Sequence, residues 1–220
     1  GGYKADYSIY GYTGDTHNTA RSKAEYDALS DGDKAAITVR KDPRINIISA
    51  TRIDSVYGGG FQARVVGNPH INVNMEEGTL MAKYMKEHSG YLSEQTETRT
   101  GSTIKWRCRQ GAEVEFEDHT TGHNGILPIG TIGNIFGGGD QANVDGNTCV
   151  EIGTGKHHND EGAEEVITPA RNAAYITGRV YGGGNLGDVT GNTTVEMSNG
   201  YVYDRIYGGC KEGNVGTVTS

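Results

Sequence analysis

Hydrophobic and polar positions alternate along much of this chain, and the alternation is part of a sequence motif that occurs several times. An aliphatic and an aromatic residue precede three glycines, and a valine, a Gly-Asn pair and an alternating segment follow. Copies begin at Val56, Ile135 and Val180, and a fourth begins at Ile206 with cysteine in place of the third glycine. Such self-similarity indicates units that bury their apolar positions by stacking on their neighbours.

The spacing of the copies predicts the kind of unit. Val180 and Ile206 open uninterrupted copies that lie 26 residues apart. Apolar residues recur at every second position within a copy, and glycine or asparagine breaks the runs. Three strands of about five residues and three short corners fill about 26 residues. We therefore expect an all-β fold, a right-handed parallel β-helix with coils of about 26 residues stacked about 4.8 Å apart.

The repeated positions predict ladders of like residues. The aliphatic residues that open the copies should stack in the interior, and so should Val65, Val144, Val189 and Val215. Pleat alternation directs the next position outward, which predicts an outer ladder of Tyr57, Phe136, Tyr181 and Tyr207. Triple glycine allows positive φ and close backbone approach. Asparagine suits the turns and can hydrogen-bond between coils, at Asn68, Asn147 and Asn192.

Two insertions interrupt the repeat, at 74–131 and 153–176. Both follow the same predicted strand, so we expect both at one corner of the β-helix, where repeat proteins often bind ligands. The pattern predicts a helix over 79–88 and a hairpin from 104–108 and 114–116. A further helix is predicted from Ser22 to about Leu29, with Glu25 in capping-box spacing to Ser22.

The insertions hold the candidate ligand contacts, which are Trp106, His119, His123, His157 and His158. The tryptophan could stack on a sugar or pack its hairpin against the rest of the protein. The histidines and their acidic neighbours could gather into a metal site, or they could be solvated loop residues. Their spacing matches no tight metal motif, so we predict neither a metal nor another cofactor.

The three cysteines predict no disulfide framework, because their number is odd. No pair of them has the spacing of zinc ligands. Cys149 occupies the strand position that His70 and Thr194 hold in other copies. We interpret the cysteines as small structural thiols, with a disulfide or a reactive thiol as the alternative.

Composition agrees with a thin, repeat-built core. The 35 glycines among 220 residues are about twice the usual share. The net charge of −8 argues against a nucleic-acid partner. The sequence contains no run of about 18 apolar residues, so we predict no segment that inserts into a membrane. We expect one domain over 1–220, which reads as a piece of a longer repeat protein.

Paired carboxylates on an outer sheet could cleave polysaccharides. The acidic residues placed for this are Asp140, Asp145, Glu151, Asp188 and Glu196. They alternate with core positions, as the acidic residues of any solvated face would. The sequence has no nucleophile elbow, phosphate loop or serine–histidine pattern, so we expect a protein without enzymatic activity.

Residues 180–195, YGGGNLGDVTGNTTV after the opening valine, resemble the glycine-rich repeat of large exported proteins from gut Bacteroides-type bacteria. The resemblance covers roughly 45–75, 132–155 and 176–218. It implies a secreted or surface-attached β-solenoid with an adhesive role, and it carries over no catalytic residues. We therefore expect an extracellular or cell-surface scaffold that displays corner loops to glycans or surface proteins, beside further repeats of the same chain. The alternative is a carbohydrate-active β-helix enzyme or its glycan-binding module.

Overall fold

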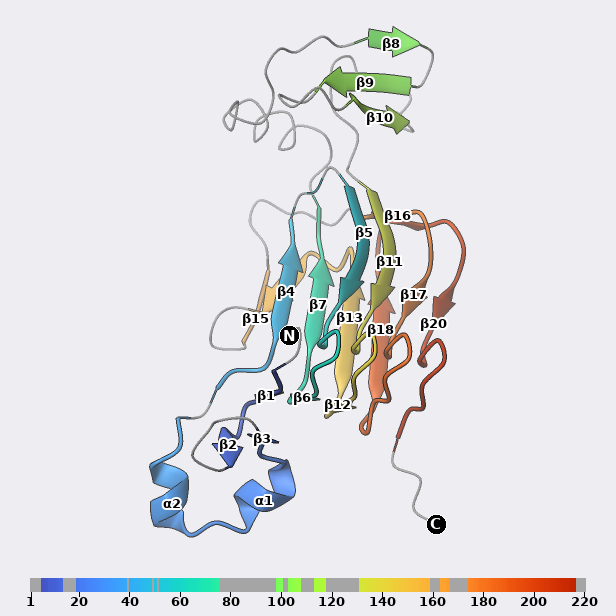
Figure 1. Ribbon diagram of the computed structural model, residues 1–220. Helices are drawn as coiled ribbons and strands as arrows, with labels where there is room; N and C mark the ends of the chain where they lie inside the picture. Colours follow the sequence, from blue (N-terminus) through green and yellow to red (C-terminus); the bar gives the residue numbers. More distant parts are fainter. Residues whose placement is uncertain are drawn as a thin grey trace.

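The computed structural model describes residues 5–13, 19–38, 40–48, 50, 52–75, 98–100, 103–107, 113–117, 131–158, 163–166 and 174–216. This part of the chain is mostly strand, arranged in six separate sheets with two short helices (Figure 1). The predicted helix over 79–88 lies outside the described residues.

Strands from successive copies of the repeat pair in parallel, in three sheets. One sheet contains β4 (Arg44–Ile47), β7 (His70–Val73), β13 (Thr148–Ile152) and β18 (Thr193–Met197). The second contains β5 (Arg52–Tyr57), β11 (Thr131–Phe136), β16 (Tyr175–Ile176), β17 (Val180–Tyr181), β19 (Tyr201–Val202) and β20 (Ile206–Tyr207). The third contains β1 (Tyr7–Ser8), β6 (Val65–Val66) and β12 (Val144–Asp145), and single bridges continue it through Val189 to Val215.

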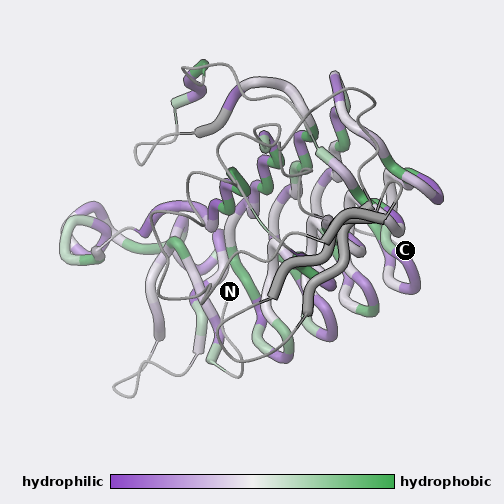
Figure 2. Tube along the Cα trace, turned by 90° about the horizontal axis from the view of Figure 1, so that it is seen from above, coloured by the Kyte–Doolittle hydropathy of each residue, from purple (hydrophilic) through white to green (hydrophobic). Residues whose placement is uncertain are grey.

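The register of these sheets aligns the copies residue by residue. Ile135 pairs with Val56 on one side and with Val180 on the other, and Val180 pairs in turn with Ile206. Successive turns of the repeat therefore lie side by side in a row (Figure 2). The aliphatic side chains meet between the first two sheets in a cluster that includes Ile71, Ile132, Ile135, Val150, Ile152 and Val180. Val65, Val144 and Val189 form a second buried cluster at the third sheet.

The aromatic ladder is present, and its middle members are buried. The ring centroids of Tyr57, Phe136, Tyr181 and Tyr207 are 4.9 to 5.0 Å apart in sequence order, with the rings nearly parallel. Phe136 and Tyr181 are each 5% exposed. These rings lie outside the aliphatic cluster, as alternation predicts, but each ring covers the faces of its neighbours.

Polar side chains also connect the copies, as the asparagine positions predict. Oδ1 of Asn68 accepts a hydrogen bond from the backbone N of Asn147 at 2.9 Å, and Oδ1 of Asn147 accepts one from the backbone N of Asn192 at 2.8 Å. Each bond runs from a side-chain carbonyl to a backbone donor, so the amides cap the turns of the following copy.

The triple glycines are required for close approach and not for positive φ. None of the glycines from 58 to 60, 137 to 139 or 182 to 184 has positive φ, whereas Gly67 and Gly146 do, at 147° and 155°. A Cβ at Gly137 would lie 2.1 Å from the carbonyl oxygen of Gly182. The prediction of positive φ at the triple glycines is therefore wrong, and that of tight backbone contact is confirmed.

The prediction that the chain forms a single all-β parallel β-helix is wrong. The structure is mixed, because strands belong to several sheets and three of those sheets are antiparallel. The antiparallel sheets contain β2 (Tyr12–Thr13) with β3 (Thr19–Ala20), β8 (Thr98–Thr100) with β9 (Thr103–Arg107) and β10 (Glu113–Glu117), and β14 (Lys156–His158) with β15 (Glu164–Val166). The repeat predicted parallel pairing between the copies. Of the antiparallel pairs outside it, only the β9–β10 hairpin was expected, and the others form from local patterns that the period of the repeat does not describe.

Two local predictions outside the repeat are confirmed. Strands β9 and β10 form the predicted hairpin, with Trp106 opposite Val114 and Ile104 opposite Phe116. Helix α1 (Lys23–Asp27) follows Ser22 with the predicted capping box, and α2 (Asp31–Ala35) follows it directly. Neither helix of the described segments is long and apolar enough to cross a membrane.

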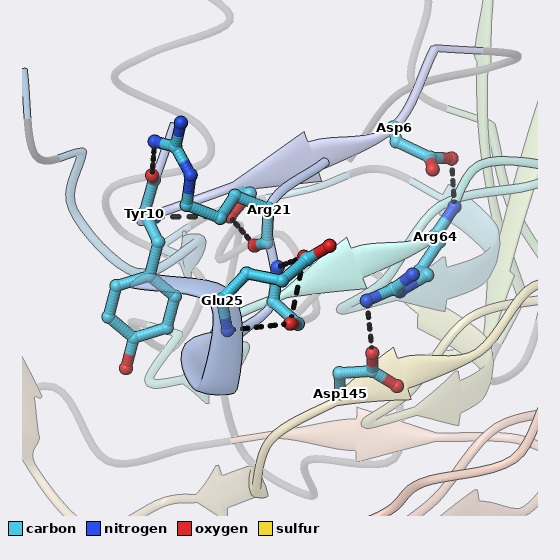
Figure 3. Close-up of polar contacts among 8 residues, drawn as sticks. Asp6, Tyr10, Arg21, Glu25, Arg64 and Asp145 are labelled. Atoms are coloured by element: carbon cyan, nitrogen blue, oxygen red, sulfur yellow. Dashed lines mark hydrogen bonds and ion pairs between the residues drawn. The ribbon is translucent and has the colours of Figure 1, made fainter. Parts of the chain in front are cut away.

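The N-terminal segment is attached to the first copy of the repeat by paired strands and by polar contacts (Figure 3). A carboxylate oxygen of Asp6 accepts a hydrogen bond from the backbone N of Arg64 at 2.8 Å. The Arg64 guanidinium lies 2.6 Å from a carboxylate oxygen of Asp145 in the second copy. Arg21 donates to the carbonyl of Tyr10 at 3.0 Å, which holds the segment between β1 and α1 in place.

Candidate functional site

Two rows of polar side chains cross the outward face of the sheet β4–β7–β13–β18. Alternate residues of these strands enter the aliphatic cluster, so the intervening residues share the opposite face. Parallel register places Arg44, His70, Cys149 and Thr194 in one row, and Asn46, Asn72, Glu151 and Glu196 in the next. Chemically different residues from separate copies of the repeat thus become neighbours.

A short contact on this face joins His70 to Glu151. Nε2 of the imidazole lies 2.6 Å from Oε2 of the carboxylate, across the space between β7 and β13. The two side chains are 13% and 8% exposed. Hydrogen bonds to a carboxylate strengthen when water is excluded, so this pair fixes the two copies against each other.

Asn72 borders the same pair and is almost fully buried, at 1% exposure. Its Nδ2 donates to Oδ1 of Asn46 at 3.1 Å, toward β4. Its own Oδ1 has no hydrogen-bond partner among the described residues. On its other side Asn72 is the register partner of Glu151 in β13. The face therefore holds a buried acceptor beside a buried carboxylate.

Cys149 lies beside His70 in the first row, and its thiol is protonated at neutral pH. Burial raises the pKa of this thiol to about 11, and the nearby carboxylates of Glu151 and Glu196 add to the rise. Burial also raises the pKa of Cys210. Both cysteines are free thiols, and the thiolate is the nucleophilic form. The structural interpretation of Cys149 and Cys210 therefore fits their surroundings, and Cys108 lies outside the described residues.

The ligand atoms of His70, Cys149 and Glu151 all lie within 4.8 Å of one another. Imidazole nitrogen, thiolate sulfur and carboxylate oxygen are donors that a zinc-type ion accepts. Donor atoms around a tetrahedral zinc stand roughly 3.3 to 3.7 Å apart by its bond lengths, so the His70–Glu151 contact would have to open. The thiol would also have to lose its proton. The cluster can hold such an ion only after these changes.

The two insertions begin at one place on this sheet. Strand β7 ends at Val73 and β13 ends at Ile152, and these two residues are register partners. Asn74 follows Val73, and its Oδ1 accepts a hydrogen bond from the backbone N of Gly155 at 2.8 Å. Its Nδ2 donates to the carbonyl of Lys156. Buried Asn74 thus joins the bases of the two insertions.

The ligand contacts predicted from the sequence are only partly within the described structure. Trp106 lies in β9, and His157 and His158 lie in β14 opposite Glu165 and Glu164. His119 and His123 lie outside the described residues. A joint site of these side chains stays a prediction. In the described part of this region, Lys156 and Glu164 form an ion pair of 2.9 Å diagonally across β14 and β15.

The acidic residues considered for catalysis are mostly engaged in contacts between copies. Asp140 accepts from Nδ2 of Asn185 at 2.6 Å, Asp188 accepts from the backbone N of Asn214 at 2.7 Å, and Asp145 pairs with Arg64. Glu151 pairs with His70. Glu196, the register partner of Glu151, is exposed. From the sequence we interpreted Glu151 as part of a solvated face, and the contact with His70 was not expected. The signal was present, because His70 and Cys149 occupy equivalent positions of the repeat.

Comparison with protein-family models, with curated proteins and with solved structures finds no match to this chain. Its function therefore has to be argued from the geometry described above.

Proposed function

We propose that this chain is a non-enzymatic, extracellular or cell-surface scaffold whose repeats display the insertions 74–131 and 153–176 for adhesion or ligand binding. The observation that carries the proposal is the common origin of the insertions, at the paired residues Val73 and Ile152. Two segments that begin side by side on a sheet can present one combined surface. The partners of this surface are a glycan or a surface protein, and nucleic acid is disfavoured by the net charge of −8.

The regular faces of the sheets support this division of roles. Their polar side chains are largely engaged in contacts from one copy to the next, as the bonds of Asn68 to Asn147 and of Asn147 to Asn192 illustrate. Side chains engaged in this way stabilise the stack and are not free to contact a ligand. The insertions differ from each other and from the repeat in sequence, so they can carry specificity.

The test begins with binding of the purified chain to an array of glycans and to intact cells with and without protease treatment. Residues 157–173 are then deleted and the ends joined by a short glycine linker, which keeps Lys156, the partner of Asn74, and the buried Ala174. We expect far-UV circular dichroism to lose no more than the signal of the β14–β15 hairpin, and binding to be lost. A control is Gln141→Ala, which removes an exposed hydrogen bond between Gln62 and Gln141, both outside the insertions, and should leave binding intact.

Three outcomes would contradict the proposal. Binding that survives this deletion and a second deletion of residues 103–117 would place the ligand on the sheets. Release of reducing sugar from a bound glycan, lost in Glu151→Gln, would favour the carbohydrate-active alternative. Absence of binding to both glycans and cells would remove the adhesive role.

A further inference from the structure

The parallel sheets end very differently at their two edges. At the N-terminal edge, Val56 is 7% exposed and Val65 is fully buried. At the opposite edge the equivalent residues Ile206 and Val215 are 42% and 40% exposed. We call this the C-terminal edge and define it as β18, β19, β20 and Val215. At this edge Ile206 and Val215 are partly exposed, whereas the equivalent aliphatic residues are buried in every earlier copy.

The first glycine of each copy shows what normally covers such an edge. A Cβ at Gly58 would lie 2.2 Å from the carbonyl oxygen of Gly137, and a Cβ at Gly182 would lie 2.4 Å from that of Gly208. These positions must be glycine because the backbone of the next copy occupies the space. A Cβ at Gly208 would have nothing within 4 Å. Position 208 is therefore also glycine, although no backbone of a following copy lies close enough to require it.

The second glycine of the copies repeats this relationship. A Cβ at Gly138 would lie 2.7 Å from the backbone N of Gly184, and one at Gly183 would lie 2.9 Å from that of Cys210. At Gly209 the nearest atom is a methyl group of Val215, 4.0 Å away. Two consecutive glycines therefore face open space in the one copy that has no successor among the described residues.

The backbone bonds identify the element that fits there. The N–H of Gly137 donates to the carbonyl of Tyr181 at 2.9 Å, and that of Gly182 donates to the carbonyl of Tyr207 at 2.8 Å. The donor is always the first glycine, and the acceptor is always the aromatic residue of the next copy. The N–H of Gly208 is the next donor in this series, and the ring of Tyr207 is the next member of the aromatic stack.

The other edge is closed by residues that are not part of a repeat. Strand β1 pairs with β6, and Asp42 accepts from the backbone N of Asn68 at 2.6 Å, in the position that an asparagine takes in later copies. Asp6 and Arg64 add the contacts shown in Figure 3. A second copy of the chain, docking by its N-terminal edge, would have to displace this cap.

We propose that the C-terminal edge binds a further unit of the same repeat, added in parallel register. Its aliphatic residue packs on Ile206, its aromatic ring stacks on Tyr207, and the carbonyl of that aromatic residue accepts from the N–H of Gly208. This inference concerns growth of the stack and is independent of the ligand that the insertions bind.

The test extends the chain by one unit, with a second copy of residues 191–216 inserted after Gly216 so that the phase of the repeat continues. We expect the extended chain to melt about 5 °C or more above the original. Gly208→Val should leave the melting temperature of the original chain unchanged, because the site is open. In the extended chain the same substitution should lower the melting temperature by at least the amount gained, because the valine blocks the added backbone.

A matched control is Leu186→Val, an exposed substitution that should behave alike in both chains. Equal effects of Gly208→Val in the original and extended chains would overturn the proposal. So would concentration-dependent association of the original chain in analytical ultracentrifugation that Gly208→Val abolishes, because the edge would then bind a second copy of the whole chain.

Discussion

The imidazole of His70 and the carboxylate of Glu151 meet at 2.6 Å although the two residues are 81 positions apart in the sequence. The two residues lie on adjacent parallel strands of different copies, and the insertion 74–131 accounts for most of the separation. Their contact depends on the register of β7 against β13, so it reports directly on how the copies stack.

Replacing Glu151 with alanine should destabilise the chain by about 1 to 3 kcal/mol, because His70 would lose a buried hydrogen-bond partner. Glu196→Ala is the matched control, since Glu196 occupies the equivalent position on β18 but is exposed. It should change stability by no more than about 0.5 kcal/mol. Urea unfolding followed by circular dichroism measures both. Equal losses in the two variants would show that the buried pair adds nothing to the stack.

Cys149 should react slowly with iodoacetamide in the folded chain until the pH approaches 11. Burial raises the pKa of this thiol to about 11 from an ordinary value of 9.0, and the thiolate is the reacting form. Peptide mapping by mass spectrometry gives the rate for Cys149, with the urea-unfolded chain as reference. Equal rates in the folded and unfolded chains at pH 8 would contradict the protected position.

The same shift predicts a pH dependence of stability. The folded state holds the Cys149 proton more tightly than the unfolded state, so the stabilisation is complete below pH 9 and is lost as the pH rises from 9 to about 11. Cys149→Ser, which cannot ionise in this range, should show a smaller decrease in the urea midpoint between pH 8 and pH 10.5. An identical decrease in both proteins would assign the pH dependence to other groups.

Gly183→Val should destabilise the chain by about 2 kcal/mol or more. The reason is steric, because a Cβ at Gly183 would lie 2.3 Å from Sγ and 2.9 Å from the backbone N of Cys210. Cys210→Gly in the same chain should recover part of the loss by removing the sulfur atom, while the backbone contact remains. Gly209→Val is the control at an open position and should be close to neutral. A melting curve of Gly183→Val that matches the parent would contradict the close approach.

The sequence predicted local features well and the global fold poorly. The hairpin of β9 and β10, the capping box of Ser22 and Glu25, and the alignment of Val56 with Ile135 could all be read from short patterns or from the repeat. The single β-helix was wrong because the period of the repeat says nothing about how the residues between copies pair. There the antiparallel sheets of β8–β10 and β14–β15 form from local alternation.

The candidate site shows a second limit of sequence reasoning. Alternation placed Glu151 on an outward face, and an outward face of a sheet is usually solvated. In the structure both residues are buried, Glu151 at 6% and Asn72 at 1% exposure of the whole residue. Burial of an outward face depends on what covers it, which the pattern of a single strand does not encode. Comparing equivalent positions across copies, rather than along one copy, brings His70, Cys149 and Glu151 together.

Phe136→Ala should be among the most destabilising substitutions in the aromatic ladder, at about 3 to 5 kcal/mol. Phe136 is buried and has a stacked ring on each side, Tyr57 at 4.9 Å and Tyr181 at 5.0 Å. Tyr207 has a stacked ring on one side only within the described chain and is half-buried, so Tyr207→Ala should lose clearly less. Near-UV circular dichroism follows the loss of ring stacking, and urea unfolding gives the free energies. If Tyr207→Ala is as destabilising as Phe136→Ala, the ladder does not draw its stability from stacking on both faces, and the end of the stack is not the weaker position that the structure predicts.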